Sequence, residues 1–376
     1  MYHRLLHPIE DKSLFLFGPR GTGKTTWVKQ QFPDAIRFDL LESKTYTELL
    51  ARPQRLELSI PQNFRGYVVI DEVQRVPELL NEVHRLIESR HLTFVLTGSS
   101  ARKLRRGGFN LLAGRALTYH MYPLTASEMG SDFYIQKAVT TGMLPLAQLG
   151  DSNEYLKSYI QTYLDQEILQ EGLTRNLTAF SRFLEVASFS QGQVLNISNV
   201  AREAEIERTT VIGYFTILQD LLIGYLIPPF TKRAKRRLVS HPKFYFFDVG
   251  VYRAIRPMGP YDTPQEIGGI SMETLVCQQL VAVNDLLKRD YTVYYYRTAT
   301  GVEVDFVLYG VHGIIAVEVK SSDTYKPEMI SGLKRFALDY PEAKLFLLYS
   351  GEKKLYDGNI TVLPLTYALS NLHTLI

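Results

Sequence analysis

The sequence predicts an α/β protein in which a mostly parallel sheet is followed by a helical segment and then by a second, smaller α/β unit. Two observations favour this order. Up to residue 130, short apolar runs bounded by glycine and polar residues alternate with amphipathic stretches, which is typical of buried parallel strands joined by crossover helices. From 154 to 227 the apolar spacing is helical, and apolar strand patterns return after it.

Individual elements follow from the same patterns. The strands expected at the front are the apolar runs 13–18, 35–40, 67–71, 92–100 and 116–124. A helix is expected at 24–32, directly after a glycine-rich turn, and another at 76–89, where apolar residues recur at helical spacing behind a proline. Towards the end we expect helices at 271–289 and 329–342, and strands at 292–298, 303–310, 313–322 and 344–350.

The composition is that of an ordinary folded protein. With 376 residues, of which 45% are hydrophobic and 22% charged, the chain is long enough for two or three domains of about 100–200 residues and is not of a disordered type. The single cysteine, Cys277, excludes an internal disulfide and a multi-thiolate zinc site. We find neither a membrane-spanning apolar run nor a signal-peptide pattern, so the expected location is the cytoplasm, without membrane contact.

The net charge of +3 is unevenly distributed along the chain. Residues 1–150 hold 19 Lys and Arg against 14 Asp and Glu, residues 151–260 hold 13 against 11, and residues 261–376 hold 10 against 14. The cationic front favours anionic partners such as phosphates, whereas the anionic end favours a carboxylate cluster that attracts cations.

A phosphate-binding loop is the strongest motif. Residues 18–25 fit the pattern G-x-x-x-x-G-K-S/T between an expected strand and an expected helix. The glycines let backbone N–H groups wrap closely around a phosphate chain, Lys24 would reach the β- and γ-phosphates, and Thr25 would bind Mg²⁺ through its hydroxyl. The residues expected to bind ATP are Gly18, Pro19, Arg20, Gly21, Thr22, Gly23, Lys24, Thr25, Thr26 and Ser99.

Two further strand ends complete the expected nucleotide site. Asp71 would help to hold Mg²⁺ and Glu72 would polarise the attacking water, which marks a hydrolase and not a passive nucleotide binder. Ser99 would lie beside the γ-phosphate, although a polar residue there could equally cap the strand. Arg115, the first candidate for an arginine that stabilises the transition state in trans, could instead be a solvated or structural arginine.

These motifs carry a family resemblance. In order, FLFGPRGTGKTT, YVVIDEVQ, FVLTGSSARKL, LLAGRAL and MYPLTASE resemble the ATPase domain of a bacterial and archaeal group of AAA-superfamily P-loop ATPases. In that group a winged-helix-like segment and a C-terminal domain of unknown function, similar in fold to the PD-(D/E)XK nucleases, follow the ATPase. The resemblance implies an ATPase domain at 1–145, a helical, winged-helix-like segment at 146–255 and a restriction-endonuclease-like domain at 256–376.

The middle segment is a candidate DNA reader. Between 196 and 243 the pattern predicts helix, turn, helix, strand, basic loop and strand, the order of a winged helix. Arg208, Thr209 and Thr210 open the second helix, where base-contacting residues belong. The loop and the following strand supply six cations for phosphate contacts, namely Lys232, Arg233, Lys235, Arg236, Arg237 and Lys243. Contact with another protein, or a merely solvated loop, is the alternative.

The C-terminal strands carry an acidic constellation. Asp305 and the Glu318-Val-Lys320 run lie on consecutive strands, and side-chain alternation directs Glu318 and Lys320 to the same face. This spacing resembles the PD-(D/E)XK core, with Glu273 on the preceding helix as a further carboxylate. Glu273, Asp305 and Glu318 are the candidate metal ligands and Lys320 the candidate catalytic lysine. A buried ion-pair network that organises the sheet is the alternative.

Together these features favour an ATP-hydrolysing protein associated with duplex DNA, whose nuclease-like module either cleaves DNA or only binds it. The alternative is an ATP-switched regulatory or assembly protein that binds another protein and has no nuclease activity. ATP and Mg²⁺ are the expected cofactors. A homo-oligomer is plausible because AAA-type sites commonly use an arginine from a neighbouring subunit.

Overall fold

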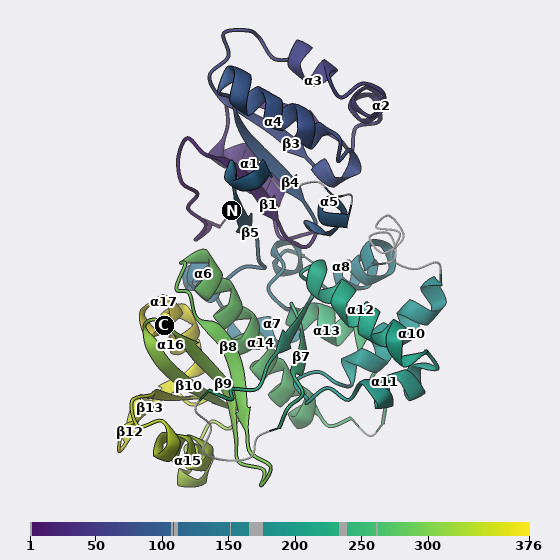
Figure 1. Cartoon of the computed structure of the whole chain (residues 1–376). Coiled ribbons are helices and arrows are strands. Elements are labelled where there is room, and N and C mark those ends of the chain that lie inside the picture. Colours follow the sequence, from purple (N-terminus) through teal and green to yellow (C-terminus); the bar gives the residue numbers. More distant parts are fainter. Residues whose placement is uncertain are drawn as a thin grey trace. The chain divides into compact units, whose positions relative to one another are not determined.

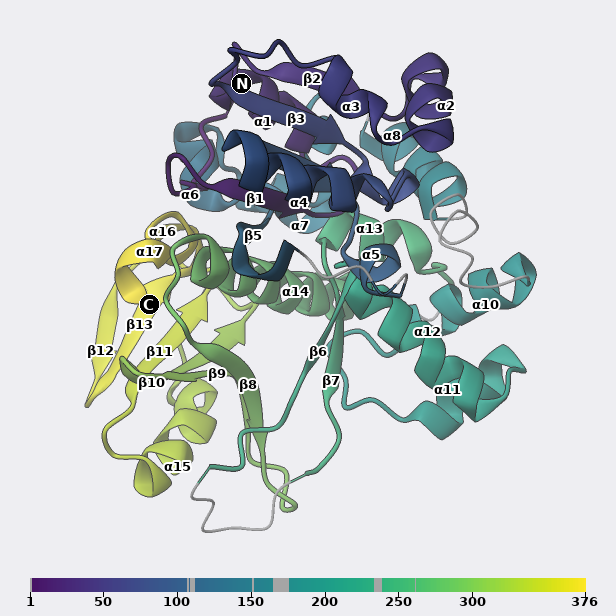
Figure 2. The ribbon, with the colours of Figure 1, turned by 45° about the horizontal axis from the view of Figure 1, so that its top comes forward.

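The computed structural model describes residues 2–106, 108, 112–150, 152–164, 176–232, 239–260 and 262–376. The chain forms two compact units. The front unit comprises Leu6–Tyr122 with Asp220–Leu222, and the rear unit comprises Pro123–Gln219 and Ile223–Ile376 with the first five residues. Figures 1 and 2 together label the elements of both units.

The front unit is built on a parallel sheet of five strands in the order β2-β3-β4-β1-β5. The strands are β1 (Ser13–Phe17), β2 (Ile36–Asp39), β3 (Tyr67–Asp71), β4 (Thr93–Gly98) and β5 (Ala116–His120). Every pairing within the sheet is parallel, so the predicted parallel α/β architecture at the front is confirmed. Because β4 lies between β1 and β3, the carboxyl ends of these three strands adjoin at one edge of the sheet.

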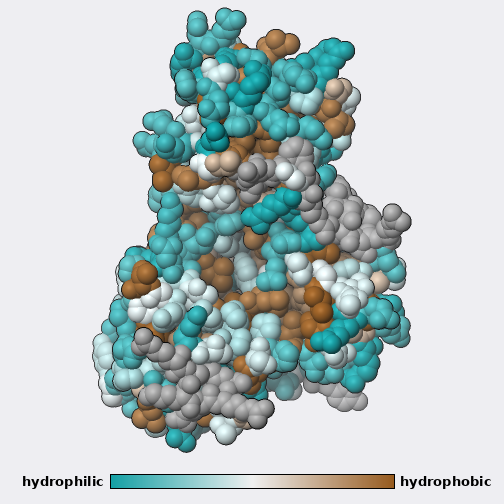
Figure 3. Space-filling model, viewed as in Figure 1, coloured by the Kyte–Doolittle hydropathy of each residue, from teal (hydrophilic) through white to brown (hydrophobic). Residues whose placement is uncertain are grey.

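Helices cover this sheet and complete its core. They are α1 (Lys24–Gln31), α2 (Ser43–Ala51), α3 (Arg55–Leu58), α4 (Leu79–Arg90) and α5 (Arg102–Arg106). Leu79, Val83 and Leu86 recur at helical spacing on α4 and pack in one cluster with Ile70 and Phe94 of the strands. On the face drawn in Figure 3, hydrophilic side chains predominate over the front unit and apolar ones are scattered, as expected when the apolar stripe of each helix faces the sheet.

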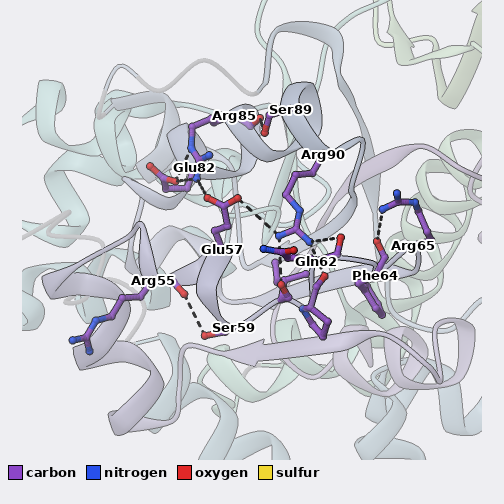
Figure 4. Close-up of polar contacts among 12 residues, drawn as sticks. Arg55, Glu57, Ser59, Gln62, Phe64, Arg65, Glu82, Arg85, Ser89 and Arg90 are labelled. Atoms are coloured by element: carbon purple, nitrogen blue, oxygen red, sulfur yellow. Dashed lines mark hydrogen bonds and ion pairs between the residues drawn. The ribbon is translucent and has the colours of Figure 1, made fainter.

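Outside this core, charged residues tie α3 to α4 (Figure 4). Arg85 Nη2 lies 2.6 Å from Glu57 Oε2 and 2.9 Å from Glu82 Oε2, and Arg90 Nη2 donates to the Pro61 carbonyl at 2.6 Å. The Arg85 and Glu57 side chains are 45% and 36% exposed, so each such pair contributes only about 0–1 kcal/mol to stability.

The rear unit begins with helices. These are α6 (Ala126–Met129), α7 (Ile135–Thr141), α8 (Ser152–Ser158), α10 (Leu177–Ser188), α11 (Ile197–Ala204), α12 (Arg208–Asp220) and α13 (Val249–Ile255). The antiparallel hairpin of β6 (Gly224–Ile227) and β7 (Lys243–Phe246) follows α12. The order helix, turn, helix, hairpin thus agrees with the pattern expected for residues 196–243.

A mixed sheet in the order β12-β13-β11-β10-β9-β8 closes the chain. Its strands are β8 (Thr292–Arg297), β9 (Glu303–Gly310), β10 (Gly313–Lys320), β11 (Lys344–Tyr349), β12 (Leu355–Asp357) and β13 (Ile360–Pro364), and its helices are α14 (Pro264–Leu286), α15 (Ser331–Asp339), α16 (Leu365–Ser370) and α17 (Leu372–Leu375). Val317 packs in the cluster that contains α14, whereas Ala316 packs in the cluster that contains α15. Alternating side chains therefore bury the sheet between these two helices (Figures 1 and 2).

The hairpin belongs to the same core as this last sheet. Ile227 and Tyr245 share a cluster with Leu280 of α14, and Phe230 N donates to Tyr295 O of β8 at 2.7 Å. Side-chain packing therefore places the second and third expected domains in one compact unit, while the three-domain boundaries stay a prediction. Within the described residues, no helix has the length and apolarity needed to cross a membrane.

Candidate functional site

The phosphate-binding loop connects β1 to α1. Gly21 and Gly23 have φ values of 75° and 92°, a left-handed backbone that favours glycine, and Gly23 caps α1. A Cβ at Gly18 would lie 2.3 Å from the Met121 carbonyl oxygen, so the loop leaves the sheet through a space that only glycine fits. The predicted turn from strand to helix is confirmed.

Lys24 lies inside the loop. Its side chain is buried, and its Nζ donates to the carbonyl oxygens of Gly18 at 2.6 Å and Pro19 at 3.1 Å. Thr22 Oγ1 also donates to the Pro19 carbonyl, at 2.7 Å. These bonds hold the ammonium against the glycine-rich backbone. Arg20 is half-buried and Thr26 is exposed at the start of α1.

Asp71 and Thr25 meet beside the loop. Thr25 Oγ1 donates to Asp71 Oδ2 at 2.9 Å, and Thr97 Oγ1 donates to Asp71 Oδ1. A carboxylate and a hydroxyl side by side at the start of a phosphate-binding helix are oxygen ligands of the kind Mg²⁺ prefers, so these residues fit the implied metal. Strand β4, placed between β1 and β3, carries the threonine that holds the carboxylate.

Glu72 and Ser99 follow the same sheet edge. Glu72 is buried, adopts a left-handed backbone with φ of 59°, and donates its N–H to Thr97 Oγ1 at 3.2 Å. Gln74, which sequence reasoning missed, donates from Nε2 to Glu72 Oε2 and to Ser99 Oγ at 3.4 Å. The signal that could have found Gln74 is its place two residues after Glu72. The structure therefore brings Lys24, Thr25, Asp71, Glu72 and Ser99 to one edge of the sheet.

Arg115 lies at the opposite edge. It directly precedes β5, whose first residue, Ala116, pairs with Ser13 at the amino end of β1. The five residues of β5, at about 3.3 Å each, separate Arg115 from the loop side by about 16 Å. Its guanidinium pairs with Glu88 and holds the pKa of that carboxyl below its usual range. Arg115 therefore cannot serve the nucleotide site of its own chain, and only a role in a second copy stays a prediction.

The acidic constellation of the rear unit contains an unforeseen lysine. Lys243 is buried, with only 2% of its surface exposed. Its Nζ lies 3.0 Å from Glu273 Oε1 and 2.6 Å from Glu303 Oε1. Tyr245 donates its hydroxyl to the same oxygen of Glu273. Lys243 is therefore not the exposed phosphate contact expected of the loop. The hairpin pairing directs its side chain into the carboxylates of α14 and β9.

The predicted strand pair is present beside it. Asp305 Oδ2 accepts a hydrogen bond from Val319 N at 2.8 Å, and Lys320 Nζ lies 2.5 Å from Glu318 Oε1. Burial raises the pKa of Asp305 well above its usual range, with the charges of Glu318 and Glu273 adding to the effect. Burial also raises the pKa of Glu318, against the lowering effect of Lys320.

These carboxylates do not meet at one point. Within the parts of the chain that the structure describes, no group of three or more His, Cys, Asp or Glu side chains is arranged to hold a metal ion. Lysines engage Glu273 and Glu318, and the buried Glu318 Oε2 has no hydrogen-bond partner among the described residues. The metal role of Glu273, Asp305 and Glu318 stays a prediction. The alternative, a buried ion-pair network, agrees with the pairs Lys243–Glu273 and Lys320–Glu318.

A groove of about 610 Å³ opens beside this cluster. Glu273, Asp305 and Lys320 line one part of it, and Phe189 and Arg256 line another, with the Arg256 guanidinium 4.5 Å from the centre of the Phe189 ring. Glu318 is not among the lining residues. The groove therefore gives a ligand access to part of the predicted constellation.

The candidate DNA-contacting residues are exposed where the structure describes them. Arg208, Thr209 and Thr210 are exposed at the beginning of α12, and Lys232 is exposed after β6. Four loop cations lie outside the described residues, namely Arg233, Lys235, Arg236 and Arg237.

Comparison with known proteins divides the chain into three matches. Residues 10–130 match a family described as an AAA domain, residues 135–262 match a domain of unknown function (DUF8612), and residues 268–368 match a second domain of unknown function (DUF4143). A solved structure, protein VC1899 from Vibrio cholerae, covers 90% of this chain and 96% of its own at 11% identity. Its TM-score of 0.24 is too low to carry a conclusion.

Relatives from bacteria match two thirds or more of the chain. The uncharacterized proteins Rv2008c of Mycobacterium tuberculosis and Mb2031c of Mycobacterium bovis are each 28% identical over 356 residues, which span 91% of this chain and 77% of theirs. An uncharacterized protein of Haemophilus influenzae is 22% identical over 272 residues, which span 67% of this chain and 65% of its own. The AAA match and the geometry of the phosphate-binding loop together support an AAA-type P-loop ATPase domain at the front of the chain.

Proposed function

We propose that this protein binds and hydrolyses ATP in its front unit and associates with duplex DNA through its middle segment. The observation that carries the proposal is the convergence of Lys24, Thr25, Asp71, Glu72 and Ser99 on one sheet edge around a glycine-rich loop. That combination supplies phosphate binding, metal binding and a general base at one place.

Each residue has a distinct role in the proposed reaction. Loop N–H groups and the Lys24 ammonium bind the phosphates, and the Ser99 hydroxyl orients the γ-phosphate. Thr25 and Asp71 hold Mg²⁺, which neutralises charge on the phosphates. Glu72 accepts the proton of the attacking water. Arg115 of a second copy stabilises the transition-state charge, and this role requires a homo-oligomer.

The middle segment supports the proposed contact with DNA. Its exposed α12 terminus carries Arg208, and the sequence between the two strands of the following hairpin contains Lys232, Arg233, Lys235, Arg236 and Arg237. This winged-helix-like arrangement suits a helix in the major groove and a loop on the phosphates. The rear module adds Asp305 and Lys320 in an open groove, which favours nucleic-acid binding or phosphodiester cleavage there.

Turnover assays separate this proposal from the alternative of an ATP-switched protein that binds only another protein. We expect the wild type to hydrolyse ATP, Lys24→Ala to lose nucleotide binding, and Glu72→Gln to bind ATP without hydrolysis. Duplex DNA should raise the wild-type rate. Turnover that no nucleic acid changes would favour the protein-binding alternative.

DNA contact and cleavage need their own measurements. We expect Arg208→Ala to weaken duplex binding across a salt series, whereas Arg335→Ala on the exposed side of α15 should not. Undetectable binding of the wild type at low salt would refute the DNA contact. Cleavage of supercoiled DNA with Mg²⁺ or Mn²⁺ should disappear in Asp305→Ala and Lys320→Ala, and cleavage that survives both would exclude this site.

A further inference from the structure

We infer that Gln74 is a positioning residue of the ATPase site, which holds the Glu72 carboxylate and links it to Ser99. This inference rests on the proposed hydrolysis of ATP. Gln74 lies in the helical turn Val73–Arg75 that follows β3, and its residue surface is only 6% exposed. A buried glutamine two residues after the expected general base has no solvent-facing role and needs partners within the protein.

The amide of Gln74 has two such partners. Nε2 donates to Glu72 Oε2 and also lies 3.4 Å from Ser99 Oγ. The orientation of the amide follows from chemistry, because the reversed orientation would turn a carbonyl oxygen towards a carboxylate oxygen. Gln74 therefore joins the residue that would activate water to the residue that would orient the γ-phosphate.

Gly98 leaves space for the Gln74 amide. A Cβ at Gly98 would lie 2.4 Å from Gln74 Oε1, so the glycine that ends β4 leaves the space the amide occupies. Gln74 Oε1 is itself buried and has no hydrogen-bond partner among the described residues. A fold that only needed to fill this space would favour an apolar side chain, since an unpartnered buried acceptor is costly.

The Gln74 amide fixes the direction of the Glu72 carboxylate. The Glu72 backbone is held by its left-handed conformation and by the hydrogen bond from its N–H to Thr97 Oγ1, and among the described residues the side-chain donor to its carboxylate is Gln74 Nε2. A base must be held within hydrogen-bond reach of the water it activates. Loss of the Gln74 amide should therefore reduce the rate of the chemical step and leave phosphate binding by the loop intact.

The test compares Gln74→Ala with Gln62→Ala, a matched change of an exposed glutamine on the same unit. We expect Gln74→Ala to lower kcat for ATP about 10- to 100-fold, because correct placement of a general base contributes about 10²–10⁴-fold. The KM and the Kd for ATP should stay within about threefold of the wild type, since Lys24 and the loop are untouched. Gln62→Ala should match the wild type in both constants.

A second variant separates positioning from folding. Gln74→Glu keeps the size of the side chain but places two carboxylates side by side, so it should lower the melting temperature. The double variant Glu72→Gln with Gln74→Glu again places an amide beside a carboxylate. We expect this double variant to recover the wild-type melting temperature without recovering turnover. An unchanged kcat in Gln74→Ala, or equal losses of kcat and ATP affinity, would overturn the role of Gln74 while leaving ATP hydrolysis standing. Absence of turnover in the wild type would overturn the proposed hydrolysis, and with it this inference.

Discussion

Replacing Lys243 with methionine should destabilise the rear unit. Methionine keeps an unbranched apolar stem but removes the ammonium that lies 3.0 Å from Glu273 Oε1 and 2.6 Å from Glu303 Oε1. Breaking a buried ion pair by removal of one partner costs about 3–5 kcal/mol, because the remaining charge is left uncompensated. The two glutamate side chains keep 20% and 28% exposure, so we expect a loss near the lower limit, about 3 kcal/mol.

Chemical denaturation can locate this loss within the molecule. Trp27 is the single tryptophan and lies on α1, so its fluorescence follows the front unit, whereas far-UV circular dichroism follows both units. We expect Lys243→Met to shift the dichroism transition of the rear unit and to leave the Trp27 transition unchanged. Lys344→Met, an exposed lysine on β11, is the matched control.

Two outcomes would refute this reasoning. A loss below about 1 kcal/mol would mean that Lys243 contributes no more than an exposed surface pair. An equal shift of the Trp27 transition would mean that the effect is not confined to the rear unit. The double variant with Glu273→Gln should recover part of the lost stability, because it removes a carboxylate that Lys243 had neutralised, whereas Glu303 Oε2 still lies 3.4 Å from Arg297 Nη1.

Three further predictions concern other sites. Gly18→Ala should abolish ATP binding measured by calorimetry, because its Cβ would lie 2.3 Å from the Met121 carbonyl oxygen; unchanged affinity would contradict the loop geometry. Burial raises the pKa of the Asp248 carboxyl to about 6 from an ordinary 3.8, so the folded state keeps this proton to a higher pH than the unfolded state does. The free energy of unfolding of the wild type, relative to that of Asp248→Asn, should therefore fall by about 3 kcal/mol as the pH rises from about 4 to 6. A pH-independent difference in urea titrations would contradict this. If Arg115 acts in a second copy, a mixture of the Arg115→Ala and Glu72→Gln proteins should hydrolyse ATP faster than either variant alone. A rate that is only the sum of the two separate rates would exclude that role.

Local patterns predicted most of the fold correctly. The five front strands match the apolar runs because a parallel sheet covered on both faces needs nearly continuous apolar sequence. The boundary of α14 was less accurate, since the helix begins at Pro264 and not at 271. Thr263 accepts a hydrogen bond from Glu266 N and caps the helix, but two glycines in its first turns hide the helical pattern.

The side-chain environments were predicted less well. Lys243 belongs by sequence to a basic loop, yet the hairpin pairing buries it among carboxylates that lie 30 and 60 positions further along the chain. Gln74 carries no motif of its own, and only its contact with Glu72 and Ser99 gives it a role. Both depend on neighbours that are distant in sequence, and one sequence does not report such neighbours.

By itself, the sequence determined the phosphate-binding loop, the order of strands and helices along the chain, and the pairing of Asp71 and Glu72 at a strand end. These depend on glycine conformation, apolar periodicity and residue spacing, all of which are local. Only the tertiary structure decided that β4 lies between β1 and β3, that Arg115 lies at the edge opposite the loop, and that Lys243 neutralises carboxylates of the rear unit. The physical reason is that strand order and charge burial are set by packing between segments far apart in the chain.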